Sequence, residues 1–128
     1  MNQSGPTVNI AEYHRTLRHE AGHWLMATLL GFKALGIRVE GSERGECTVS
    51  LEIPTPDMDT LRLFLENRCK QLYAGFVAER VRDGAIHAEM HADEIWHTSS
   101  AYFRDCAKFT ELIYFLANIS GEEPTPEL

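Results

Sequence analysis

Apolar residues recur at helical spacing in three stretches of the chain. The first covers residues 10–30, where the apolar positions on one face are Leu17, Ala21, Trp24, Leu25 and Leu29. Asn9 with Glu12 three residues later predicts the N-terminal cap of this helix, and Gly31 predicts its end. On this pattern we expect Trp24 to be buried on the helix face.

Two further helices are expected. Thr55 before Pro56 predicts a cap, followed by a helix to about residue 83 that Gly84 stops. The third helix is expected over residues 92–118, and the pattern allows a break near Arg104.

A fourth stretch has a different period. Residues 36–40 and 47–53 alternate between apolar and polar side chains, and residues 41–45 between them are rich in turn-forming types. This pattern predicts a β-hairpin. The fold class expected is therefore mainly α with a small β-hairpin. We expect a flexible segment at residues 1–8, a single domain at residues 9–120 and a tail at residues 121–128.

Composition narrows the class of protein. A chain of 128 residues with 44% hydrophobic and 24% charged residues is typical of one globular domain. The formal net charge of −7 argues against nucleic acid as a partner, because phosphate binding draws on clustered basic residues. No apolar run reaches membrane-spanning length, and the three cysteines, which form no C-x-x-C pair, favour reduced thiols. We therefore expect a soluble, cytoplasmic protein that binds neither nucleic acid nor membrane.

The first helix carries a metal-binding pattern. His19, Glu20 and His23 form an H-E-x-x-H motif, and side chains four residues apart lie on the same helix face. Two imidazoles at this spacing can converge on one Zn²⁺ ion, and the adjacent carboxylate can reach a water on the metal. Gly22 inside the motif weakens the helix, which suggests close approach by another segment.

A catalytic zinc site needs a third protein ligand and an open position. The motif does not supply that ligand. Residues 84–97 are dense in candidates, and spacing alone does not choose among His87, Glu89, His91, Asp93, Glu94 and His97.

The motif and two later segments resemble one known family. Residues 18–23, R-H-E-A-G-H, are similar to the active-site helix of the FtsH-type ATP-dependent zinc proteases. In that family a β-hairpin follows this helix, a later helix carries an alanine- and glycine-rich R-V-A-E-E segment, and an N-D-L-x-x-A-T pattern supplies an aspartate as third ligand. Residues 73–80 are similar to the second element and residues 92–98 to the third, although Ala92 replaces the asparagine and His97 the alanine.

The resemblance implies a zincin-like helical metallopeptidase domain, here without the ATPase module or membrane anchor. It implies that Asp93 is the third Zn²⁺ ligand beside His19 and His23. From the residues themselves, His91, Glu94 and His87 stay as alternative third ligands. Glu20 would be the general base in hydrolysis of peptide bonds, with a peptide or an unfolded protein as substrate. We expect an endopeptidase rather than an exopeptidase. The alternative is a zinc-binding, non-hydrolytic, peptidase-like module that acts in protein–protein interaction.

Overall fold

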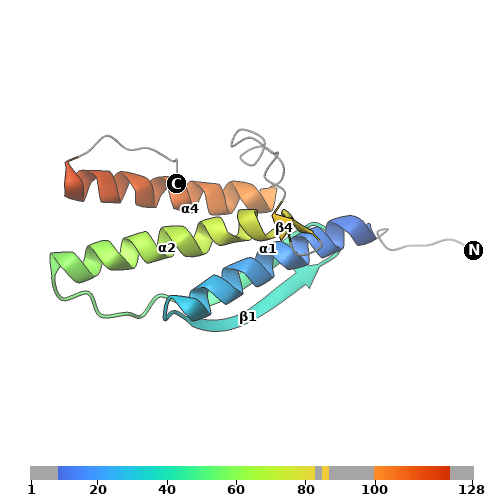
Figure 1. Ribbon diagram of the computed structural model, residues 1–128, viewed down its shortest axis with the longest axis horizontal. Helices are drawn as coiled ribbons and strands as arrows, with labels where there is room; N and C mark the ends of the chain where they lie inside the picture. The colour runs from blue at the N-terminus through green and yellow to red at the C-terminus, as the bar shows by residue number, and fades with distance from the viewer. Residues whose placement is uncertain (1–8, 83–84, 87–99, 122–128) are drawn as a thin grey trace, which may run out of the picture.

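The architecture is mainly helical with a small antiparallel hairpin, which confirms the expected secondary-structure class (Figure 1). The structure is a computed structural model that describes residues 9–82, 85–86 and 100–121. In chain order its elements are α1 (Ile10–Leu29), β1 (Lys33–Glu40), β2 (Arg44–Ser50), α2 (Met58–Ala78), β3 (Val81–Arg82), β4 (Ala85–Ile86) and α4 (Ser100–Ser120). In Figure 1, α2 runs between α4 on one side and α1 with its hairpin on the other.

Helix α1 begins and ends where the sequence predicts. The Asn9 side chain accepts a hydrogen bond from the backbone N–H of Glu12 at 3.0 Å, so the cap is confirmed. Gly31 follows the helix with a φ of +88°, a left-handed conformation that favours glycine. The Glu12 carboxylate does not complete a capping box; it accepts a hydrogen bond from the Ser42 hydroxyl instead, at 3.1 Å.

The hairpin formed by β1 and β2 is also confirmed, with its second strand shifted toward the N-terminus. The strands pair from Lys33 opposite Ser50 to Glu40 opposite Arg44, with an irregularity between Ala34 and Gly36. The hairpin is tied to α1 by the Thr16 hydroxyl, which donates to the Ser42 carbonyl at 2.8 Å. This packing brings β2 over the H-E-x-x-H face of α1.

Helix α2 differs from the expectation at both ends. Its cap is Asp57 rather than Thr55, because Asp57 and Thr60 form a reciprocal capping box that satisfies both backbone N–H groups. The helix ends at Ala78, five residues before the expected end, and the chain then enters the short β3–β4 pair.

The apolar core lies between α2 and α4. Cys69 and Leu72 from α2 pack with Phe109 and Ile113 from α4, and all four side chains are buried. Helix α4 runs without a break through Arg104. Residues 92–99 of the expected third helix lie outside the described residues. Among the described residues, no helix is long and apolar enough to cross a membrane.

The contact between α1 and α2 is unusually close at Gly22, as the sequence suggests. A Cβ atom at this position would lie 2.4 Å from the Ala78 Cβ and 2.7 Å from the Ala74 carbonyl oxygen. Only glycine fits there without displacing a backbone. The close approach lets side chains of the two helices meet around the motif.

Candidate metal centre

Two imidazoles of α1 are buried one turn apart and turned toward one another. His19 is 1% exposed and His23 is 3% exposed. Their Nε2 atoms are 2.9 Å apart, and the ring of Phe76 packs edge-on against His19 with centroids 5.1 Å apart. The spacing of the motif therefore produces the convergence that it predicts.

A carboxylate from α4 completes the group. The Oδ2 atom of Asp105 lies 2.9 Å from the Nε2 of His19 and 3.0 Å from the Nε2 of His23. These three residues, called here the metal cluster, each offer one ligand atom to a common point. Tetrahedral zinc with bonds of roughly 2.0–2.2 Å sets its ligand atoms about 3.3 Å apart, so the cluster fits the ion after small outward shifts.

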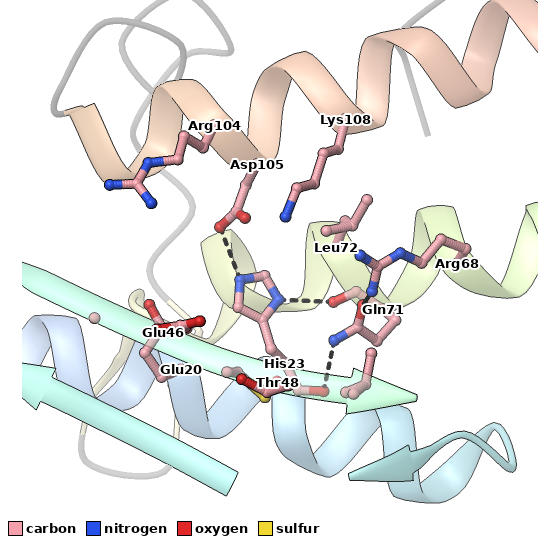
Figure 2. A pocket seen from close by; sticks show the side chains of 13 residues that line it. Glu20, His23, Glu46, Thr48, Arg68, Gln71, Leu72, Arg104, Asp105 and Lys108 are labelled. Carbon is pink, nitrogen blue, oxygen red and sulfur yellow. Dashed lines mark hydrogen bonds and ion pairs between the residues drawn. The ribbon is translucent and has the colours of Figure 1, made fainter. Parts of the chain in front are cut away.

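The other ring nitrogen of each histidine is held by an acceptor. The Nδ1 of His19 is 2.7 Å from Oε2 of Glu79, and the Nδ1 of His23 is 2.9 Å from the backbone carbonyl oxygen of Gln71. Figure 2 shows His23 between Asp105 and Gln71, with one ring nitrogen directed at each. Metal-binding histidines characteristically have such acceptors on the second nitrogen, which fix the tautomer and the ring plane.

These acceptors determine where the lone pairs point. Because Nδ1 of each ring donates its proton outward, a neutral His19 and a neutral His23 both present an unprotonated Nε2 to the other and to the Asp105 carboxylate. Three electron-rich atoms facing one another repel unless a cation lies among them. Either a proton or a metal ion can serve as that cation.

The ionisation behaviour of the cluster reflects this need for positive charge. Burial alone would lower the pKa of His19, but hydrogen bonds to Asp105 and Glu79 outweigh it and raise the pKa to about 9. Burial would raise the pKa of Asp105, but the hydrogen bonds from His19 and His23 hold it well below its usual range. These shifts show that the cluster favours a positive charge at this point, carried by a proton or by a metal ion.

Space for the two imidazoles is made by a glycine of α2. A Cβ atom at Gly75 would lie 2.5 Å from both Cε1 and Nε2 of His23 and 2.9 Å from Cε1 of His19. These distances are shorter than real Cβ contacts. Gly75 is therefore a part of the site, although it contributes no ligand atom.

Glu20 lies beside the metal cluster and is 3% exposed. Gly45 of β2 covers it so closely that a Cβ there would lie 2.7 Å from the Glu20 Oε2 atom. Burial raises the pKa of Glu20, while the neighbouring charges of His19 and His23 lower it in part. A buried carboxylate next to a cation site is placed to accept a proton from a group bound there and to return it.

The structure brings together three of the four site residues predicted from sequence: His19, Glu20 and His23. Asp93 and the other candidates, His87, Glu89, His91, Glu94 and His97, lie outside the described residues, so the assignment of Asp93 stays a prediction. Sequence reasoning missed Asp105, Glu79 and Gly75. One signal for Asp105 was present: it precedes Thr110 by five residues, the separation in the N-D-L-x-x-A-T pattern, but Asp93 and Thr98 have the same separation.

Compared with known proteins, the chain matches no family model, no curated protein and no solved structure at a significant level. The resemblance to FtsH-type proteases therefore rests on the quoted sequence segments alone. The metal cluster rests on the geometry described above and is independent of that resemblance.

Proposed function

We propose that this protein is a zinc-dependent peptidase in which His19, His23 and Asp105 hold the ion and Glu20 is the general base. The observation that carries the proposal is the convergence of three possible ligand atoms, Nε2 of His19, Nε2 of His23 and Oδ2 of Asp105, with both Nδ1 atoms hydrogen-bonded to Glu79 and Gln71. Nitrogen and oxygen ligands of this kind, three in number, are typical of catalytic zinc.

The residues of the site have separate tasks. Zinc bound there would supply a Lewis acid that polarises a carbonyl group and makes water more acidic. Glu20 would take a proton from the attacking water and deliver it to the leaving amine. Glu79 and Gln71 would hold the imidazole rings in place, because each accepts a hydrogen bond from an Nδ1 atom.

The order of the elements supports a zincin-like, FtsH-type peptidase domain. A hairpin follows the helix with the motif, the next helix packs against the motif, and an aspartate of a later helix joins it. On this proposal Asp105 rather than Asp93 is the third ligand. The substrate class is a peptide or an unfolded protein, cut as by an endopeptidase. All three cysteines are free thiols, which fits a reducing compartment such as the cytoplasm.

The test is cleavage of unfolded casein by protein loaded with zinc, compared with Glu20→Gln. The variant keeps the size of the side chain and leaves the ligands untouched. We expect it to bind zinc normally and to lose about 10²–10⁴-fold in cleavage rate. Equal cleavage by the variant and the parent would contradict the role of Glu20.

One observation favours a second candidate, a zinc-binding module without hydrolytic activity. Glu20 is covered by β2, and burial raises its pKa, so a Glu20 that stays protonated would not act as a base. The same experiment separates the two functions. Zinc bound at about one ion per chain without cleavage of casein or of any peptide would favour the interaction module.

A further inference from the structure

A pocket of about 220 Å³ opens beside the metal cluster, between β2, α2 and α4. His23 and Asp105 line it, so any group held there lies next to the ion site. Small-molecule sites are usually larger, roughly 300–1,000 Å³. The pocket suits a single side chain of a longer ligand.

Basic side chains gather around this pocket although the chain as a whole is acidic. The protein has 12 Lys and Arg residues and a net charge of −7, yet Arg68, Arg104 and Lys108 all line this space. In Figure 2, Arg68 of α2 and Lys108 of α4 lie on the same side of His23, whereas Glu20 and Glu46 lie on the other side. One half of the pocket is therefore cationic.

Arg68 is the most constrained of these residues. Its Nη1 donates to the Oε1 of Gln71 at 2.6 Å, while the Nε2 of Gln71 donates to the His23 carbonyl oxygen at 3.1 Å. The guanidinium is partly buried, and within the described part of the chain no carboxylate forms an ion pair with it. A desolvated cation without an ionic partner is costly unless an anion binds to it.

A bound divalent ion would change the balance of the pocket. The acidic residues that line it are Glu20, Glu46 and Asp105, and they match the three basic residues in number. The ion would offset two of these negative charges, which leaves the pocket positive. Its chemistry then favours an anionic ligand.

We infer that this pocket is a subsite for a carboxylate side chain of the substrate, with Arg68 and Lys108 as the specificity-determining residues. The inference rests on the proposed peptidase function and names its substrate class: peptides with glutamate or aspartate close to the cleaved bond. Consecutive residues of an extended peptide are roughly 3.3–3.6 Å apart. Because the pocket and the metal cluster share His23 and Asp105, the acidic residue lies within one or two positions of that bond.

The test measures binding as well as cleavage. The probes are acetylated and amidated octapeptides of alanine and leucine with one glutamate moved along the sequence, each with a glutamine twin. Binding is measured by calorimetry on zinc-loaded Glu20→Gln protein, and cleavage on the zinc-loaded parent. Because the peptide ends are blocked, the glutamate is the only anion in each probe.

We expect the best glutamate peptide to bind about tenfold more tightly than its glutamine twin. The reason is that only the glutamate carboxylate forms charge-assisted hydrogen bonds with the basic side chains of the pocket. Lys108→Gln and Arg68→Gln should each reduce this ratio toward one. Lys70→Gln is the matched control, because Lys70 is an exposed residue of α2 that does not line this pocket. Lys108→Glu, a change at an exposed position, should reverse the preference toward a lysine-containing peptide.

The outcomes keep the two proposals apart. Discrimination in binding without cleavage by the parent supports the subsite and contradicts the peptidase function. Cleavage with equal affinity for the twins, or discrimination that survives Lys108→Gln and Arg68→Gln, overturns the subsite and leaves the peptidase function standing.

Discussion

The two faces of α1 are the reverse of what an amphipathic helix usually shows. The buried residues of α1 are Thr16, His19, Glu20, His23 and Ala27, and all of them except Ala27 are polar. The face with the larger apolar residues is turned outward: Trp24 is 41% exposed, Leu25 55% and Leu29 70%. The expectation that Trp24 is buried is therefore wrong.

This difference shows which face the fold is built to protect. Burying polar groups is costly unless they are paired, while exposing apolar side chains forgoes the free energy of burying them. In α1 the buried side chains of Thr16, His19 and His23 are hydrogen-bonded, but the exposed apolar face forgoes burial. This arrangement is explained if the inner face exists to hold a cation, whose binding stabilises the folded state by mass action.

The largest difference between the two faces of α1 is expected when one residue is removed from each face. We expect His23→Ala to abolish stoichiometric zinc binding, because one of three ligands and the Gln71 hydrogen bond are lost. Leu25→Ala should leave zinc binding intact and change the free energy of unfolding by about 0.5 kcal/mol or less, as for most exposed positions. Metal analysis and urea unfolding would measure both. Retention of zinc by His23→Ala would contradict the assignment.

Gly75→Ala tests the inner face from the side of α2. At an ordinary helix position this change stabilises by roughly 1 kcal/mol. Here we expect it to destabilise by about 1–3 kcal/mol and to weaken zinc binding, because the new methyl group would meet both imidazoles. Gly36→Ala is the control, since a Cβ there meets nothing within 4 Å. Thermal melts with and without zinc measure the effect, and equal behaviour of the two variants would count against the described packing.

Glu79→Gln tests the hydrogen bond between the Glu79 carboxylate and the Nδ1 atom of His19. The carboxylate that accepts the Nδ1 hydrogen bond would become a neutral amide, so we expect zinc affinity to fall about 10–100-fold. Glu66→Gln, at an exposed position of α2, should leave affinity unchanged. Competition with a chromogenic chelator gives both affinities. An unaltered affinity in Glu79→Gln would contradict a role for the negative charge of Glu79 in zinc binding.

The stability of the metal-free protein should fall as pH rises, whereas the affinity for zinc should increase. The pKa of His19 is raised from 6.5 to about 9 in the fold, so its protonated form stabilises the metal-free protein fully below pH 6.5. That contribution is lost as pH rises to about 9. Because zinc must displace the same proton, its affinity should increase over this window by about tenfold per pH unit. Calorimetry at several pH values measures the affinity, and an affinity independent of pH would exclude displacement of a proton.

The sequence predicted the helices, the hairpin and the convergence of His19 and His23 on α1, because each is encoded by local spacing. It did not reveal Asp105 or Glu79, since they reach His19 from 86 and 60 residues away, through tertiary packing. Apolar periodicity predicted the wrong buried face of α1, because such a prediction takes the apolar side chains to be the buried ones. The N-cap of helix α2 is Asp57 rather than Thr55 because a capping box outweighs the preference of proline for the first turn.

The most direct test of the account is a zinc titration of the parent, Asp105→Ala and Asp93→Ala, followed by X-ray absorption at the zinc edge. We predict about one zinc per chain in the parent and in Asp93→Ala, with two imidazole nitrogens and a carboxylate oxygen at roughly 2.0–2.2 Å. Asp105→Ala should lose tight binding. A parent that binds no zinc, or an Asp105→Ala variant with the parent's affinity and spectrum, would contradict the claim that His19, His23 and Asp105 form a metal site.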